Sequence, residues 1–221
     1  MMDWTALQLS FALALATSLV LLPVGILLAR PLARSRSRHR WLLEAALTLP
    51  LVLPPTVLGY YLLVAMGAAS PLGALYERWI GHPLAFSFEG LLLASIVFNI
   101  PFALIPMLRA FEAVNAEVLQ AARLCGMGPW QAFLRVELPL CWPGVMSGMV
   151  MTAAHTLGEF GVVLMVGGNI PGETRTVAIA IYDRVQAFDM RGAGMMSAFL
   201  LVVSLLALGL AARQGRGARS L

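Results

Sequence analysis

The 221-residue chain contains no lysine, and all 15 of its cationic side chains are arginines. A phosphate-binding loop of the GxxxxGK[ST] type needs its lysine to reach the nucleotide, and a Schiff base needs a lysine amine. Both a Walker-type ATP site and lysine-based covalent catalysis are therefore excluded. Cysteine is scarce as well: Cys125 and Cys141 form no CxxC pair and have no histidine at metal-ligand spacing. We expect no metal and no cofactor.

Charged residues are also scarce in this chain. Charged residues make up 12% of it and hydrophobic residues 60%, against about 25% and 45–50% in soluble domains. The mean hydropathy is +0.83. Such a chain is too apolar for disorder and has too little polar surface for a soluble globule. An all-α integral membrane protein is the class that remains.

Five uncharged apolar stretches are long enough to cross about 30 Å of hydrocarbon as helices: 7–29, 45–67, 90–108, 143–166 and 193–212. They predict about five transmembrane helices in one domain over 1–221, with a core at about 7–212. The first stretch is too long for a signal peptide and is preceded by Asp3 rather than by arginine, so we expect it to remain as a helix.

The arginines predict the orientation. With five spans, eleven of them fall on one side: five in the loop 30–40, three in the segment 109–141, and the tail residues Arg213, Arg216 and Arg219. The other side holds Arg78, Arg175, Arg184 and Arg191. Arginine-rich short loops are cytoplasmic, so the N-terminus is expected outside and the C-terminus inside. Because these arginines lie between apolar runs, the net charge of +4 indicates membrane topology and not nucleic-acid binding.

Two of the spans have irregular sequences. The second contains Pro50, Pro54 and Pro55, which predicts either a kinked packing helix or a helix that lines a pathway. Between 138 and 172 the only charged residue is Glu159, and the segment is too long for one straight span. We expect a helix that bends or ends near Glu159, then a short outer loop and a short amphipathic helix within 176–188.

The segment 109–141 is the strongest functional motif. Two short amphipathic helices are predicted, at 115–124 and 129–136. Gly126 and Gly128 break the chain between them, and Pro129 is well placed at the start of the second helix. Together they would form a compact knob with an apolar face, where the small side chains of Ala121 and Ala122 let a partner approach closely. The plainer alternative is a helix-turn-helix loop that lies on the membrane.

The residues of this segment resemble the EAA loop of permease subunits from type I ABC importers; the matching positions are Gln120, Ala121, Ala122, Gly126, Leu138 and Pro139. Gln120 stands where glutamate is usual, so a salt bridge at that position is not expected. The resemblance implies coupling helices that dock on a separate ABC ATPase subunit, which would hydrolyse ATP while this chain is not itself an enzyme. Because five spans are few to enclose a pathway, a homodimer is expected.

Two further segments are similar to molybdate permeases: LGEFGVVLMVGGNIPGETRT from Leu157 to Thr176, and LPLVLPPTVLGYYLL from Leu49 to Leu63. Sulfate and thiosulfate permeases share less of them, and tungstate permeases are closely related. The resemblance implies import of molybdate across the cytoplasmic membrane of a bacterium, with a periplasmic oxyanion-binding protein as a partner. Tungstate or sulfate/thiosulfate import is the first alternative, and an anion channel or secondary transporter the second.

Candidate gate or pathway residues lie in the same segments. Glu159 and His155 are four residues apart, on one helix face. A role for these two residues as direct ligands of the passing ion is disfavoured, because a carboxylate repels a dianion. Two other interpretations are open: Glu159 acts as a hinge or gate, or the residues simply lie at the outer interface. The remaining candidates are the neutral or cationic donors Thr56, Asn169, Thr174, Arg175 and Thr176, together with Pro54, Pro55 and Gly161. For the donors, loop solvation or turn capping is the simple alternative.

Overall fold

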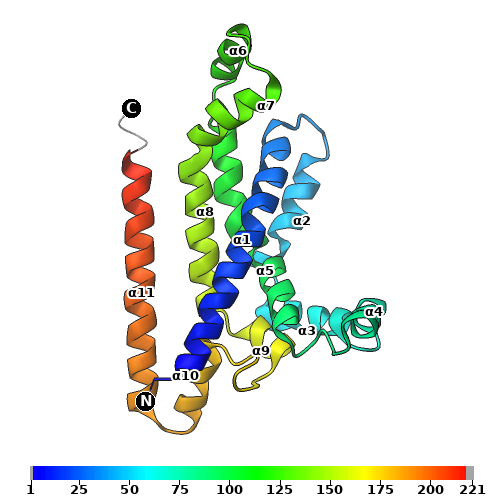
Figure 1. Ribbon diagram of the computed structural model, residues 1–221, viewed down its shortest axis with the longest axis vertical. Coiled ribbons are helices and arrows are strands. Elements are labelled where there is room, and N and C mark those ends of the chain that lie inside the picture. Colours follow the sequence, from blue (N-terminus) through cyan, green and yellow to red (C-terminus); the bar gives the residue numbers. More distant parts are fainter. Residues whose placement is uncertain (1, 218–221) are drawn as a thin grey trace.

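The computed structural model describes residues 2–217, and all of its regular structure in that range is helical (Figure 1). The elements in order are α1 (Trp4–Arg34), α2 (Arg40–Val52), α3 (Pro55–Met66), α4 (Pro71–Ile80), α5 (Phe88–Glu112), α6 (Ala116–Leu124), α7 (Pro129–Ala132), the π-helical turn η1 (Phe133–Glu137), α8 (Leu138–Gly158), α9 (Gly161–Gly167), α10 (Val177–Gln186) and α11 (Met190–Gly217). The all-α prediction is confirmed.

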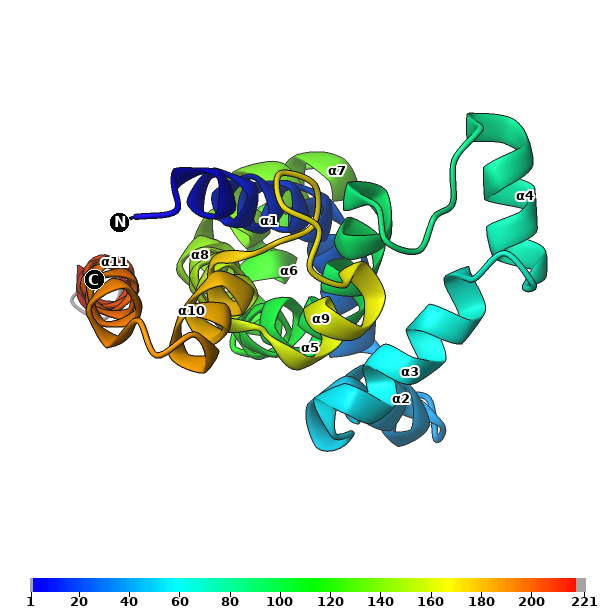
Figure 2. The ribbon, with the colours of Figure 1, turned by 90° about the horizontal axis from the view of Figure 1, so that it is seen from below.

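The centre of the molecule is a bundle of α1, α5 and α8, which run side by side in both ribbon views (Figures 1 and 2). Small residues allow the close approach of α8 to α5: a Cβ added to Gly148 would lie 2.6 Å from the carbonyl oxygen of Ala103. Two buried apolar clusters fill this bundle, one around Leu91 and Phe98 and one around Leu104 and Met107.

Two predicted spans are single unbroken helices. The stretch 7–29 lies within α1 and the stretch 90–108 within α5, and both helices are long and apolar enough to cross a membrane. Each begins at a side-chain cap: Asp3 accepts a hydrogen bond from the N–H of Ala6, and Ser87 from that of Gly90. The stretch 193–212 lies in α11, whose apolar part is Met190–Leu206.

The irregularity predicted for the second span, 45–67, is a complete break of the helix and not only a kink. The chain breaks after Val52, and α2 and α3 meet at an angle of 106°. Pro54 and Pro55 cause the break: neither has an N–H to donate, and the residue before a proline is driven out of the α conformation. Leu53 is accordingly extended. Seen from below, α3 and α4 project to one side of the bundle (Figure 2).

The fourth predicted span, 143–166, is also broken, and its helix begins earlier than expected. The helix runs from Pro129 through η1 to Gly158, and α9 then departs at 64°. The predicted bend near Glu159 is therefore confirmed. The prediction of a separate short helix at 129–136 is wrong, because α7 and η1 continue directly into α8.

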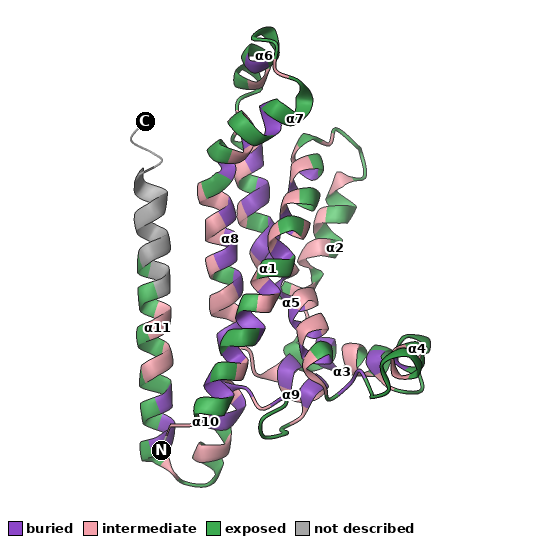
Figure 3. Cartoon of the chain, in the orientation of Figure 1, coloured by how far each residue is buried: buried purple, intermediate pink, exposed green. Residues whose placement is uncertain are grey.

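Different loops and short helices lie at the two ends of the bundle. The loop between α1 and α2, the helices α6 and α7, and the end of α11 lie at one end, whereas the N-terminus, α9 and α10 lie at the other (Figure 1). Three arginine-rich regions thus share one end, although Arg219 lies outside the described residues. Exposed residues run along the helices on the flanks of the bundle (Figure 3). Many of the exposed residues are large apolar ones, Val52 and Tyr61 among them, as expected for surfaces that meet lipid or another subunit.

Candidate functional site

The segment 109–141, named the coupling loop after its predicted role, has a sharply defined turn. The Asn115 side chain caps α6 by accepting from the N–H of Glu117. At the other end, Gly126 has φ +81. Its N–H donates to the Arg123 carbonyl, and the N–H of Met127 donates to the Ala122 carbonyl. This pair of bonds is a Schellman motif, whose left-handed position favours glycine.

The knob presents an apolar surface at the tip of the molecule. Leu124 is 89% exposed, and Val118 and Trp130 are exposed as well. Gln120 and Ala121 face solvent, whereas Ala122 is buried. Leu138 and Pro139, at the end of the segment 109–141, form the first turn of α8.

An ion pair between a buried carboxylate and two partly exposed arginines ties this end of α8 to α1, and the sequence analysis missed it. Glu137 is 1% exposed in the π-helical turn. Its carboxylate accepts from Arg30 Nε at 3.0 Å and from Arg34 Nη2 at 2.5 Å. The Arg30 guanidinium also lies 4.3 Å from the ring centroid of Phe133. The sequence does show two arginines four residues apart at the end of an apolar run. Nothing in the sequence indicates that their partner is Glu137, which lies 103 positions after Arg34.

The two broken helices meet at the opposite end. A Cβ added to Gly161 would lie 2.8 Å from Cβ of Pro55, and one added to Gly59 would lie 2.8 Å from Cβ of Met165. The starts of α3 and α9 therefore touch, and no larger residue fits between them. The structure brings Pro55 and Gly161 together, with Pro54 and Thr56 exposed beside them.

Glu159 spans the break between α8 and α9. Its Oε1 accepts from the N–H of Val162 at 2.9 Å, so the side chain caps α9. His155 Nε2 lies 3.9 Å from its other oxygen, and the imidazole stacks on Phe102 with centroids 3.8 Å apart. Glu159 is therefore partnered by a backbone donor and not turned toward open space, which suits a hinge better than an ion ligand.

A line of buried polar groups crosses the bundle behind this hinge, and it too was missed. Thr17 donates to Ser95 at 2.7 Å, and the Asn99 amide donates to Thr156 at 2.9 Å and to the backbone of Ser95. The Asn99 Oδ1 lies 3.2 Å from Nδ1 of His155. The line links α1, α5 and α8, but each member read alone looks like an ordinary small polar residue in a span.

The outer-loop candidates form a separate group. Asn169 donates to both oxygens of Asp183, at 3.0 and 2.8 Å, and accepts from Arg175 Nε at 2.6 Å. Arg175 also lies 3.6 Å from Asp183. Thr174 and Thr176 are buried, and Thr174 accepts from the N–H of Ile170. These contacts order the loop, and the charge of Arg175 is balanced by Asp183.

Comparison with known proteins agrees with this architecture. Residues 21–219 match the family model described as the binding-protein-dependent transport system inner membrane component. The chain is 45% identical over 206 residues to the molybdenum transport system permease protein ModB of Azotobacter vinelandii, covering 93% of this chain and 91% of that protein. It is 41% identical to ModB of Escherichia coli K12, covering 83% of this chain and 80% of that protein.

Solved transporters share the fold. A bacterial alginate ABC transporter, crystallised with an alginate pentasaccharide-bound periplasmic protein, superposes with a TM-score of 0.74 at 21% identity, covering 96% of this chain and 77% of the other. The inward-facing MetNI methionine ABC transporter gives 0.69 at 17% identity, with 98% and 94% covered. The chain belongs to the inner membrane components of binding-protein-dependent transport systems, and within that family to the molybdenum transport permeases.

Proposed function

We propose that this chain forms the membrane path for molybdate in an ATP-driven importer. The observation that carries the proposal is the 45% identity to a molybdenum permease over 93% of the chain. That match includes the segments around the α3–α9 contact, so it covers the region where a path would cross the outer half of the membrane. Tungstate, as a tetrahedral dianion of the same kind, is the runner-up cargo.

ATP hydrolysis belongs to a separate subunit in this proposal. The chain has no lysine for a Walker loop, and the exposed Leu124 at the tip of α6 offers an apolar surface for an ATPase. Two copies of the chain would surround the path, with the exposed apolar faces of α2 and α3 between them. A periplasmic oxyanion-binding protein would deliver the cargo at the α10 end.

The path itself is proposed to open and close at the α3–α9 contact. Pro54, Pro55 and Thr56 line one side, and Glu159 and Gly161 form the hinge on the other. Two half-helices that meet end to end can part without breaking a helical hydrogen-bond ladder. The loop residues Asn169, Thr174, Arg175 and Thr176 are proposed to shape the outer mouth. Asn169 and Arg175 are held by each other and by Asp183, and the buried Thr174 fixes the loop by accepting from the N–H of Ile170.

Competition uptake tests the cargo. Cells that carry the complete importer as their only molybdate system are given labelled molybdate with excess tungstate, sulfate or no competitor. Molybdate uptake that tungstate suppresses and sulfate does not is the expected result. Uptake that sulfate suppresses equally would contradict the assignment. Uptake by cells that express this chain without its ATPase would instead identify a channel or secondary transporter.

Cysteine labelling in intact cells tests the orientation. In a variant whose exposed Cys125 is replaced by serine, Ser37→Cys reports on the loop 30–40 and His82→Cys on the opposite end. A membrane-impermeant maleimide should label His82→Cys and leave Ser37→Cys unlabelled. Labelling of Ser37→Cys from outside would reverse the proposed topology.

A further inference from the structure

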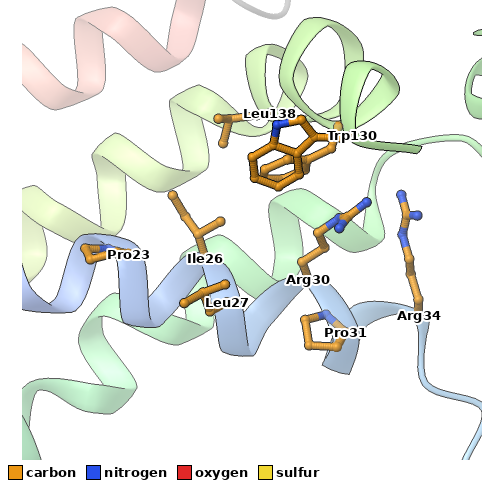
Figure 4. Close-up of a pocket in the computed structure, with 9 residues that line it drawn as sticks. Pro23, Ile26, Leu27, Arg30, Pro31, Arg34, Trp130 and Leu138 are labelled. Carbon is orange, nitrogen blue, oxygen red and sulfur yellow. The ribbon is translucent and has the colours of Figure 1, made fainter. Parts of the chain in front are cut away.

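A groove on the surface of α1, at the end that carries the coupling loop, has no role in the transport mechanism proposed above. Its volume is about 620 Å³, and it lies between α1 and the α7–η1–α8 rod. The walls are apolar and come from both elements, with Ile26 and Leu27 on α1 and Leu138 on α8. Only two of the lining side chains are charged, Arg30 and Arg34, and both lie at one end of the groove (Figure 4).

The charge at that end is not balanced. Arg30 and Arg34 share the single carboxylate of Glu137, which leaves one net positive charge. Each guanidinium has five N–H donors and uses one on Glu137 in the contacts above. The two arginine side chains are 33% and 37% exposed, whereas Glu137 is 1% exposed. The groove therefore offers free donors and positive charge, while the anion that fixes the arginines is sealed behind them.

The depth of this end in the membrane follows from the sequence of α1. The uncharged apolar run 7–29 ends at Arg30, so the guanidinium groups lie at the boundary between hydrocarbon and headgroups. Trp130, which is 66% exposed, stands over the groove at the same end (Figure 4). Tryptophan and arginine are the residues that favour this interfacial layer.

We propose that this groove binds one anionic phospholipid from the leaflet on the coupling-loop side. Its phosphate would accept from Arg30 and Arg34, because basic pockets between helices at this depth suit anionic headgroups. One of its two acyl chains would lie along Pro23, Ile26 and Leu27. A zwitterionic lipid has the same acyl chains, but its headgroup has no net charge. It therefore has no negative charge to balance the second arginine.

Native mass spectrometry of the full-length chain in detergent tests the proposal directly. The probes are dioleoyl phosphatidylglycerol and dioleoyl phosphatidylcholine at equal concentration. Arg34→Gln should lower the ratio of phosphatidylglycerol to phosphatidylcholine adducts about fivefold, the effect of one arginine at a membrane surface. Arg109→Gln is the matched control, because Arg109 lies at the same end, is 69% exposed and does not line the groove. It should leave the ratio unchanged.

Two further variants keep the test independent of folding. Glu137→Gln removes the counter-charge and should raise the ratio, whereas a purely structural role for the ion pair would not raise it. Leu27→Trp fills the apolar part of the groove on a side chain that is 71% exposed, so the fold should tolerate it while adducts of both lipids decrease.

Several results would overturn the proposal. Equal adducts of the two lipids, or a preference that Arg34→Gln does not change, would exclude an anionic-lipid site here. Displacement of phosphatidylglycerol by inorganic phosphate at equal concentration would indicate an anion site without a role for acyl chains. Adducts that are found on the monomer and lost from the dimer would assign the groove to a second copy of the chain.

Discussion

Gly161 lies so close to Pro55 that a Cβ added to the glycine would be 2.8 Å from Cβ of the proline. The proline ring cannot rotate away, unlike the end of a long side chain, so the contact between the two broken helices sets the size of residue 161. Because α3 and α9 begin at this contact, their relative position depends on it.

Gly161→Ala is expected to destabilise the chain by about 1–3 kcal/mol, the usual cost of overpacking, and to lower molybdate uptake. Thermal unfolding in detergent and uptake in cells measure the two effects. Gly158→Ala is the control: it lies at the other side of the same break, and an added Cβ would meet nothing within 4 Å. Equal behaviour of the two variants would mean that the contact is not limiting.

Gly126→Val is expected to uncouple ATP hydrolysis from transport. The left-handed backbone at Gly126 costs a β-branched residue at least about 1–2 kcal/mol, so the α6–α7 turn should lose its fixed shape. The ratio of ATP hydrolysed to molybdate imported, measured in vesicles with the complete importer, should rise. Gly128→Ala should leave that ratio unchanged, because Gly128 has φ −65 and open space around it. Normal coupling in Gly126→Val would refute a rigid turn.

Asn99→Leu is expected to lower stability by about 1–3 kcal/mol, the cost of unmet buried polar groups. The amide joins α5 to α8 through Thr156 and faces His155, and both partners would lose a contact. Thr48→Val is the comparison, because the Thr48 hydroxyl bonds only to backbone carbonyls of its own helix. Melting curves in detergent that coincide for the two variants would show that the buried line adds nothing to stability.

Asp189 predicts a pH dependence at the corner between α10 and α11. The N–H of Gly192, and then the guanidinium of Arg184, hold the pKa of Asp189 below its ordinary value. A carboxylate whose pKa is lowered by folding stabilises the fold above its unfolded pKa, about 3.9, and loses that contribution as the pH falls through the lower folded value. The melting-temperature difference between wild type and Asp189→Asn should therefore be constant from pH 7 to about pH 5 and disappear in stronger acid.

Glu173→Gln, an exposed carboxylate at the same end, is the control for that measurement. Its melting temperature should track that of the wild type over the whole range. A difference for Asp189→Asn that grows in acid would reverse the sign and contradict the assignment.

Local patterns predicted the elements of this fold well. Apolar runs located α1 and α5, and the glycine and proline positions located the α6 turn and the bend at Glu159. Pro54 and Pro55 were noticed, but the complete break of the second span was not predicted. Hydropathy has the same value whether or not a helix continues across a pair of prolines. A bend of 106° depends on how α3 packs against α9, which is a tertiary contact.

The site was less accessible to sequence reasoning for the same reason. Gly126 and Ala122 belong to one local motif and were found. The Glu137 ion pair joins residues more than a hundred positions apart, and the Thr17–Ser95–Asn99–Thr156 line draws on three helices. Arg175 was predicted as a cationic candidate for the gate or pathway. In the structure its charge is balanced by Asp183, and that pairing again becomes visible only in three dimensions.

The unbroken helix from Pro129 to Gly158 has a mechanical consequence. At 1.5 Å per residue this rod is about 45 Å long, with the docking knob at one tip and the Glu159 hinge at the other. If the rod pivots near one tip, a tilt of only about 5° displaces the other by about 4 Å, by the same geometry. In the proposed importer, a small movement of the ATPase at the knob would therefore become a larger displacement at the Glu159 end. The Glu137 ion pair with α1 lies near the knob end of this helix.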